Sequence, residues 1–497
     1  MSFEFLKKII DGIKKLDEDV NDYKKVVKSP YMPSVAYVNW AIHLAETGEI
    51  DEAEEKLISS TLMGHQTPEA YIHLGMLKIK EKKFEEAKEF YTKALMLDNN
   101  NSKAYCFLGN VYTEMQNFDE AEKNFSKALK IDSNNPDIMI NWGISFIRQK
   151  KFLQAKEKFQ QASKLNIPNF NAIYFLGLVD LELGDIEQAK SKFKMIVSSV
   201  PNNYEAFYYL AYIYYKQEKY EDGLREALNS LEIFNKKAET YMLIAECYMK
   251  LKDKQHSIEY YELGWKECSV NYFFYISWGL SLQNFECNEE AKEKFEKAIE
   301  INDKIDLGFS SLGVSHFRLK EYERALDMLA KALEINPQNI IALDNLGQIY
   351  FKKEDYKEAI RYFHSVLGLS AKAVWNYERI AQAYEFDGDI RNANLYYKKA
   401  LEYQPESVGV YINYAKFLIK QKDYKAALKK LQKAYKLENQ NIESLNLLFY
   451  VNYALAKENI SDYNMEKALE IAREIEENYP DAFIYHNEKS ELEVIGK

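Results

Sequence analysis

At 497 residues the chain is longer than most single domains, although a repeat protein extends one architecture over such a length. It carries 66 basic and 77 acidic residues, and the formal charge is −11. Acidic and basic residues alternate along the sequence. This pattern argues against a nucleic-acid partner, because proteins that bind nucleic acids gather their basic residues into patches.

The sequence also indicates a protein that folds in a reducing compartment. Hydrophobic residues make up 47% of the chain, but no apolar run reaches the roughly 20 residues that cross a bilayer. The first residues lack the apolar core and cleavage site of a secretory signal. The four cysteines (Cys106, Cys247, Cys268 and Cys287) match neither a disulfide framework nor a zinc site. We expect a cytoplasmic protein without a membrane span.

Residues 1–33 are expected to form an N-terminal capping helix. Phe5, Leu6 and Ile9 begin an apolar face that continues to Leu16, and charged residues occupy the other positions. Such a helix would cover the exposed end of the element that follows. A helix lying on a membrane or on a partner is the alternative, although its polar face mixes both charge signs.

Residues 34–441 hold twelve units of 34 residues without insertion or deletion. The eighth position of every unit is glycine or alanine: Ala41, Gly75, Gly109, Gly143, Gly177, Ala211, Ala245, Gly279, Gly313, Gly347, Ala381 and Ala415. Position 24 is usually aromatic. Large side chains against small ones allow two helices to approach closely, so the columns predict helices packed in pairs.

Each unit has two stretches of about a dozen residues with the apolar period of a helix, separated by a polar turn. Pro201, Pro337 and Pro405 fall in the turns that close their units. A helical pair of this kind cannot bury its own apolar face, so consecutive units must stack on one another. The sequence therefore predicts an all-α solenoid.

The pattern continues less regularly to the C-terminus. An irregular thirteenth unit is predicted over residues 442–481, with about seven inserted residues around 457–464. Residues 482–497 are expected to form a C-terminal cap or tail. Repeats seven and eight (238–305) depart most from the pattern, since Lys254 and Asn288 stand where most other units carry an aromatic residue. Weaker packing there would favour local flexing.

The twelve in-phase units resemble the tetratricopeptide repeat family, whose signature has a small residue at position 8, alanine at 20 and an aromatic residue at 24. The resemblance implies antiparallel helix pairs stacked in a right-handed superhelix, with the first helix of each pair lining the concave side. It also implies that binding residues project from positions 2, 5, 6, 9, 12 and 13 of that first helix.

The polarity of the residues at these positions changes along the chain. The middle repeats carry apolar or tyrosine residues where a solvated face would be polar, and repeats ten and eleven carry acidic and amide residues. An apolar trough ending in an acidic segment would suit an elongated protein partner with basic residues at one end. The candidate partner-binding residues are Tyr174, Leu178, Tyr208, Tyr212, Tyr215, Met242, Met249, Asp344, Asn345, Gln348, Glu378, Gln382 and Glu385.

The stretch FYYLAYIYYKQEKY (207–220) contains both expected core residues and candidate surface residues. Phe207, Leu210, Tyr214 and Tyr220 occupy the positions that the family buries, whereas Tyr208, Tyr212 and Tyr215 share one further face. The simpler alternative is that all these apolar residues only pack between adjacent first helices. The lysine and asparagine set that grips chaperone C-termini is absent, because position 5 of repeats one to four is Val38, Ile72, Cys106 and Ile140.

No catalytic or cofactor motif stands out, so the sequence predicts neither an enzyme nor a metal or cofactor site. His43 and His73 lie in adjacent first helices but lack the further ligands that zinc requires. We expect a scaffold that binds an extended or helical protein segment. The alternative is a repeat arm or adaptor of an assembly, secretion or glycosyl-transfer machine whose active subunit is a separate chain.

Overall fold

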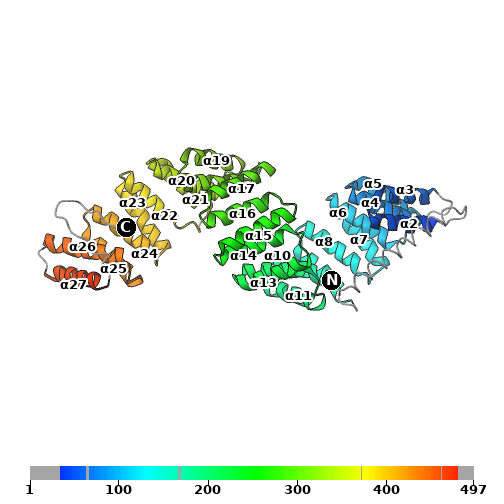
Figure 1. Ribbon diagram of the computed structural model, residues 1–497, viewed down its shortest axis with the longest axis horizontal. Helices are drawn as coiled ribbons and strands as arrows, with labels where there is room; N and C mark the ends of the chain where they lie inside the picture. Colours follow the sequence, from blue (N-terminus) through cyan, green and yellow to red (C-terminus); the bar gives the residue numbers. More distant parts are fainter. Residues whose placement is uncertain (1–33, 63–66, 166–168, 371, 460–461, 479–497) are drawn as a thin grey trace. The chain divides into compact units, whose positions relative to one another are not determined.

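The computed structural model describes residues 34–62, 67–165, 169–370, 372–459 and 462–478. These residues fold into helices that pair in chain order, and they contain no strand (Figure 1). The predicted all-α solenoid of helix pairs is therefore confirmed. The expected caps at 1–33 and 482–497 lie outside the described residues.

The first helices of the pairs begin 34 residues apart from Ser34 to Ile340, and α22 begins at Asn376 instead of Val374. They are α2 (Ser34–Thr47), α4 (Pro68–Lys80), α6 (Ser102–Glu114), α8 (Pro136–Arg148), α10 (Phe170–Glu182), α12 (Tyr204–Lys216), α14 (Ala238–Lys250), α16 (Tyr272–Asn284), α18 (Asp306–Arg318), α20 (Ile340–Lys352), α22 (Asn376–Phe386), α24 (Val408–Lys420) and α26 (Ile442–Asn459).

The second helices keep the same period up to α25. They are α3 (Ile50–Thr61), α5 (Phe84–Leu97), α7 (Phe118–Ile131), α9 (Phe152–Ser163), α11 (Ile186–Ser199), α13 (Tyr220–Ile233), α15 (Lys254–Glu267), α17 (Asn288–Ile301), α19 (Tyr322–Ile335), α21 (Tyr356–Leu369), α23 (Ile390–Tyr403), α25 (Tyr424–Leu437) and α27 (Asp462–Asn478). In the thirteenth pair, α26 runs on to Asn459 and α27 starts late, in the region where the insertion is predicted.

The chain divides into two compact units, residues 1–247 and 248–497, and the division falls inside α14. It lies in the part of the sequence where we expect the weakest packing. Whether this junction flexes stays a prediction. The hand of the superhelix depends on the placement of both units, so it also stays a prediction.

In every repeat but the sixth, where position 24 is Ala227, a small residue at position 8 stands with a large residue at position 24. A Cβ atom added to Gly75, Gly109, Gly143, Gly177, Gly279 or Gly347 would lie 2.5–2.8 Å from a ring atom of the aromatic residue at position 24. The rings of Tyr91, Phe125, Phe159, Phe193, Phe295 and Phe363 are buried against these glycines. The close approach that the small-residue column predicts is therefore present, and the aromatic side chain fills the space over the glycine.

Position 15 of all twelve units adopts the left-handed conformation, with φ between 58° and 92°, although only Gly48, Gly184 and Gly388 are glycine there. In repeat two the N–H of Lys83 donates to the carbonyl of Lys78 at 2.8 Å, and Lys82 N–H donates to Ile79 at 2.9 Å. This pair of bonds is a Schellman motif, which ends the first helix. The next helix then starts two residues later, which keeps the pair antiparallel.

Side-chain caps start many helices. Asn101, Asn135, Asn169, Asn203, Asn271 and Asn339 each accept a hydrogen bond from a backbone N–H in the first turn of a first helix. Asparagine is a favoured N-cap because its side-chain oxygen satisfies an N–H group that has no partner within the helix. The short turns between pairs are thus fixed by local chemistry.

We predict that Gly143→Ala loosens repeat four. The new Cβ would lie 2.5 Å from a ring atom of Phe159, and overpacking of this kind costs roughly 1–3 kcal/mol, more than the about 1 kcal/mol that alanine gains in helix propensity. Hydrogen exchange should show a lower opening free energy for residues 136–163.

Gly409→Ala is the matched control, because no atom lies within 4 Å of its added Cβ. Adding Phe159→Leu to Gly143→Ala should restore part of the protection against exchange. Repeat one has this combination naturally, because Ala41 at position 8 and Leu57 at position 24 are both buried in one cluster. Unchanged exchange in Gly143→Ala would contradict the packing account.

Candidate functional site

Each of the thirteen candidate residues is half-buried. Residues at position 5 of repeats one to four, by contrast, are buried, with Val38, Ile72, Cys106 and Ile140 at 4–7% exposure. Those four belong to the core, which agrees with the absence of the chaperone-binding set. The candidates at 174–242 lie in the first unit, and those from Met249 onward lie in the second.

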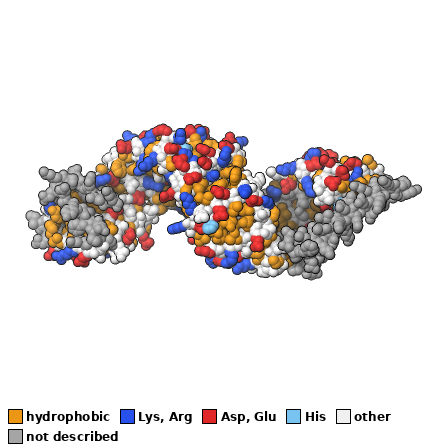
Figure 2. All heavy atoms as spheres, in the orientation of Figure 1, with side chains coloured by type: hydrophobic (Ala, Val, Ile, Leu, Met, Phe, Trp, Pro, Cys, Tyr) orange, Lys and Arg blue, Asp and Glu red, His pale blue; other side chains and the backbone are white. Residues whose placement is uncertain are grey.

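In the first unit, α10 and α12 present a row of tyrosines. The ring of Tyr209 stacks on the buried Phe193 at 5.3 Å, and Tyr174 meets both rings edge-on at 6.0 and 5.9 Å. Tyr174 and Leu178 pack against the core cluster around Phe193. Figure 2 shows hydrophobic side chains gathered near the places where Figure 1 labels α10 and α14. This end of the row is anchored to the core.

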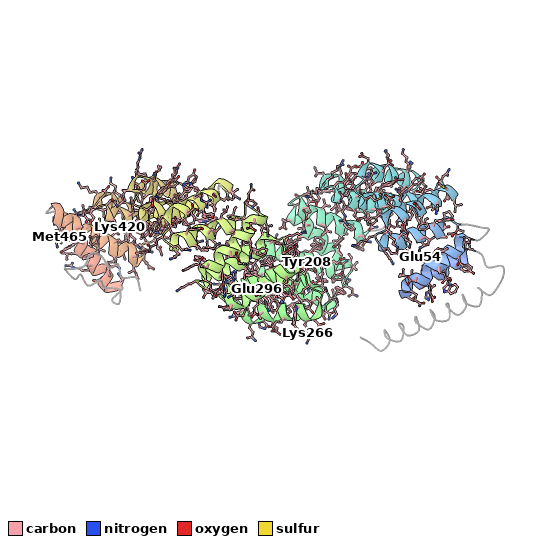
Figure 3. The ribbon with its side chains drawn as sticks, turned by 90° about the horizontal axis from the view of Figure 1, so that it is seen from above. Glu54, Tyr208, Lys266, Glu296, Lys420 and Met465 are labelled. Carbon is pink, nitrogen blue, oxygen red and sulfur yellow. The ribbon has the colours of Figure 1, made fainter. Side chains whose placement is uncertain are left out.

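Tyr208 and its neighbours extend the row (Figure 3). Tyr208 meets Tyr209 edge-on at 5.2 Å, and the ammonium of Lys237 lies 4.2 Å from the centre of the Tyr208 ring. Burial raises the pKa of the Tyr208 phenol, and nearby Tyr209 adds to the effect. The hydroxyl therefore stays protonated at neutral pH and remains a hydrogen-bond donor.

Tyr212 and Tyr215 complete this side of α12. Lys216 lies 5.3 Å from the Tyr212 ring, and Tyr215 meets Tyr220 edge-on at 5.8 Å. Burial also raises the pKa of Tyr215, with Glu246 as the next cause. We define Tyr174, Leu178, Tyr208, Tyr212, Tyr215 and Met242 as the tyrosine face.

In the second unit the candidate carboxylates already have partners. Asp344 pairs with Arg379 and accepts a hydrogen bond from Gln348 at 2.8 Å. Glu378 accepts one from Asn413 at 2.6 Å. The acidic residues thus join consecutive first helices, and each bond links residues 35 apart when it crosses between repeats.

Glu385 follows the same rule. It accepts hydrogen bonds from Lys420 at 2.6 Å and from the Tyr397 hydroxyl at 2.8 Å. Its side chain is 10% exposed. A basic partner would have to compete with these internal donors.

A pocket of about 360 Å³ opens between α16, α18 and α20. Its apolar lining includes Leu280, Val314, Phe317 and Ile341, and its polar lining includes Gln283, Ser311, Arg318, Asn345 and Gln348. We call this the first-helix pocket. It brings together Asn345 and Gln348, two of the candidate residues, with apolar residues from positions 9 and 12 of the preceding repeats.

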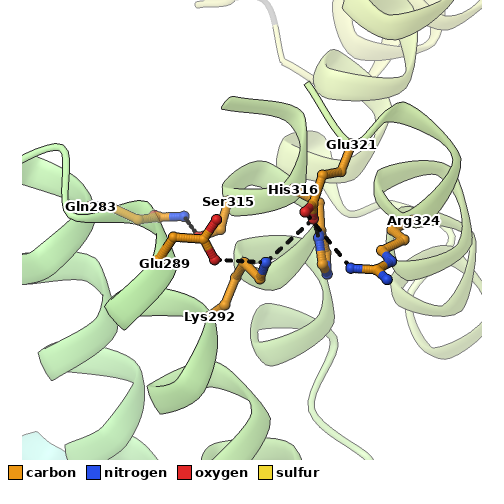
Figure 4. A network of polar contacts seen from close by, with 7 residues as sticks. All are labelled: Gln283, Glu289, Lys292, Ser315, His316, Glu321 and Arg324. Atoms are coloured by element: carbon orange, nitrogen blue, oxygen red, sulfur yellow. Dashed lines mark hydrogen bonds and ion pairs between the residues drawn. The ribbon is translucent and has the colours of Figure 1, made fainter. Parts of the chain in front are cut away.

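Gln283 holds one wall of this pocket (Figure 4). It is buried, and its side-chain amide donates to the carbonyl of Ser311 at 2.9 Å and to the Ser315 hydroxyl at 2.7 Å. Arg318 donates to the backbone carbonyl of Gln283 at 2.8 Å. These bonds tie α16 to α18. Sequence reasoning missed Gln283, although an amide at a position that is usually apolar is a signal.

Ionisable residues occupy another usually apolar position, position 11, in repeats two, five and nine. Lys78 pairs with Glu54 at 2.7 Å, and the fully buried Asp180 is held by Lys156 at 2.8 Å and Lys192 at 2.5 Å. His316 contacts Glu321, which also pairs with Lys292 at 3.3 Å (Figure 4). Lys78 and Asp180 are thus neutralised by charged residues of neighbouring helices, and His316 is hydrogen-bonded to Glu321, so all three are structural.

Metal sites and membrane spans were sought in the part of the chain that the structure describes. No group of three or more histidine, cysteine or acidic residues there is placed to hold a metal ion. No helix among those residues is both long and apolar enough for a membrane span. Figure 2 shows acidic and basic side chains interspersed over the region where Figure 1 labels α17 and α19.

Family models described as tetratricopeptide repeat match residues 68–101, 102–135, 174–239, 238–264, 307–372 and 387–448. Together the matches cover more than half of the chain. The chain belongs to the tetratricopeptide repeat (TPR) family. None of the curated proteins compared with this TPR chain matches it.

Solved structures with helix pairs of the same kind share little sequence with the TPR chain. Yeast Tom70 is 16% identical, with 88% of this chain and 99% of that chain covered and a TM-score of 0.43. Cut9, in the APC/C Cut9–Hcn1 hetero-tetramer, is 14% identical over 84% and 96%, with a TM-score of 0.38. PilF of Pseudomonas aeruginosa is 24% identical over 39% and 89%, with a TM-score of 0.36. Scores this low support no conclusion about function.

We predict that Gln283→Leu destabilises the α16–α18 junction by about 1 kcal/mol, because leucine keeps the volume but cannot donate to Ser311 or Ser315. Hydrogen exchange of residues 272–318 measures the opening free energy. Gln338→Leu changes an exposed glutamine in the same unit and should have little effect. Equal exchange in both variants would show that the amide does not hold the wall.

Proposed function

We propose that this TPR chain is a non-enzymatic scaffold that binds an extended or helical protein segment along its first helices. TPR repeats are in general protein-interaction modules, and the six matched ranges place this chain among them. The proposal adds the binding mode and the residues. The tyrosine face in one unit and the first-helix pocket in the other are each a candidate site for such a segment.

The first-helix pocket is the observation that supports this proposal most. Three consecutive first helices contribute to it, and its apolar residues lie beside the amides of Asn345 and Gln348. Ligand sites combine apolar side chains with polar groups that fix the ligand's orientation, and this pocket has four apolar and five polar lining residues. The apolar part would take a large side chain of the partner, and the amides would bond its backbone.

The tyrosine face supports the same mode in the first unit. Ala206, Leu210, Ala211, Ile213 and Tyr214 form the buried core of α12, and position 24 of the same repeat is Ala227 instead of a large residue. Tyr208, Tyr212 and Tyr215 are additional apolar area, and each phenol offers a polar tip.

The carboxylates contribute in a different way. Because Asp344, Glu378 and Glu385 are paired within the chain, they first fix the spacing of α20, α22 and α24. A cationic partner would exchange with these internal pairs, which costs part of the attraction. We therefore assign binding energy to the apolar residues and orientation to the charged ones.

We predict that replacing Tyr208, Tyr212 and Tyr215 together by serine removes the protein partners that the wild-type chain captures. Loss of these three half-buried rings would weaken binding at least about tenfold. Affinity capture followed by mass spectrometry compares the two proteins, and circular dichroism checks that helix content is retained.

The matched control replaces Met96, Leu153 and Met195 by serine, because these are exposed hydrophobic residues on second helices of the same unit. It should keep the wild-type partners. Identical partners with the tyrosine variant, when it is fully folded, would remove the tyrosine face from the site. Loss of helix content in that variant would instead assign the tyrosines to packing.

A further inference from the structure

Three tyrosine rings surround one lysine in the first unit. The ammonium of Lys237 lies 4.2 Å from the centre of the Tyr208 ring, 5.7 Å from Tyr204 and 6.0 Å from Tyr209. Tyr208 and Tyr209 stand nearly perpendicular, at 80°, so they form two walls of a corner. Phe234 packs on Tyr204 at 4.7 Å and supports the third wall. We call this group the tyrosine cage.

The cage is suited to a cation. The faces of aromatic rings carry negative potential, and cations within about 6 Å of a ring centre are attracted to it. Glu205 and Glu239 add negative charge, since both raise the pKa of Lys237. Burial acts more strongly in the opposite direction and lowers that pKa overall. The site attracts positive charge, but it removes water from an ammonium that hydrates strongly.

Lys237 reaches the cage from the connection between α13 and α14, where residues 234–237 form no regular helix. Its ammonium sits at the end of a four-carbon stem, so it can leave the cage without moving either helix. The cage itself is fixed, because Tyr204, Tyr208 and Tyr209 all lie on α12 and Tyr209 stacks on the buried Phe193.

We propose that the tyrosine cage is a binding site for a methylated or quaternary ammonium group, and that Lys237 is its internal competitor. The inference rests on the proposed function, because Tyr208 belongs to both the cage and the tyrosine face. The ligand is a trimethylated lysine side chain of the bound segment. Such a group loses less hydration than a lysine ammonium and covers more of the ring faces.

The test uses tetramethylammonium chloride as the probe and sodium chloride at equal ionic strength as the reference. Lys237→Ala empties the cage without changing its walls. Saturation-transfer NMR on the probe's methyl protons should show binding to this variant roughly tenfold tighter than to the intact chain, because the competitor is gone.

Two further variants define the site. Tyr208→Leu added to Lys237→Ala removes the nearest wall and should abolish the gain, and Tyr204→Leu in its place should reduce it. Lys216→Ala removes a lysine that lies 5.3 Å from a single ring, Tyr212, and should behave like the intact chain. Circular dichroism confirms the fold of each variant.

Equal probe binding by Lys237→Ala and the intact chain would overturn the inference, and Lys237 would then only cover the rings. The proposed function fails separately. Suppose that the triple serine variant loses its protein partners and that the probe does not bind Lys237→Ala. The scaffold proposal then stands without the cage. Suppose instead that the probe binds Lys237→Ala more tightly than the intact chain and that the triple serine variant keeps its partners. The cage then stands, and the tyrosine face is not the site for those partners.

Discussion

The fold depends on the close approach of two helices at one point in every repeat but the sixth, where a glycine or alanine at position 8 faces a large side chain at position 24. Because the ring over Gly143 or Gly347 fills the space that a Cβ atom would need, the two helices of a pair meet in a fixed relation. That contact uses one side of each first helix. The tyrosine face and the first-helix pocket are formed by residues on other sides of these helices, and the residues of the tyrosine face are half-buried.

A second rule acts between repeats, where side chains bond to residues 35 positions away. Asp344 with Arg379, Glu378 with Asn413 and Glu385 with Lys420 all follow it. These bonds turn a run of acidic residues into links between helices, so the second unit holds less free negative charge than its sequence suggests. Lys78 and Asp180 at position 11 are neutralised in a similar way, by a carboxylate or by lysines of adjacent helices. Charge in this protein therefore mainly orders the stack, and apolar area is left to attract a partner.

Much of the fold could be predicted from the sequence, because one residue type at one position repeats the same contact many times. Gly75 to Gly347 fix the register, and the helix starts follow it closely. The left-handed residue at position 15 could not be predicted from residue type, since Lys82 or Glu218 adopts it as readily as Gly184. The candidate residues were placed on first helices, but their partners were not visible. Lys237 enters the cage from a connection, and the side-chain amide of Gln283 stands at a repeat position that is usually apolar, so neither follows from the periodic pattern.

Site-specific photo-crosslinking tests most directly whether the first helices carry the partner. A benzophenone amino acid would replace Tyr212 or Gln348 on first helices, and Leu153 on the second helix α9 as the reference. We expect a protein partner to be cross-linked from Tyr212 and from Gln348, and not from Leu153. Equal cross-linking from all three positions, or cross-linking from Leu153 alone, would contradict this expectation.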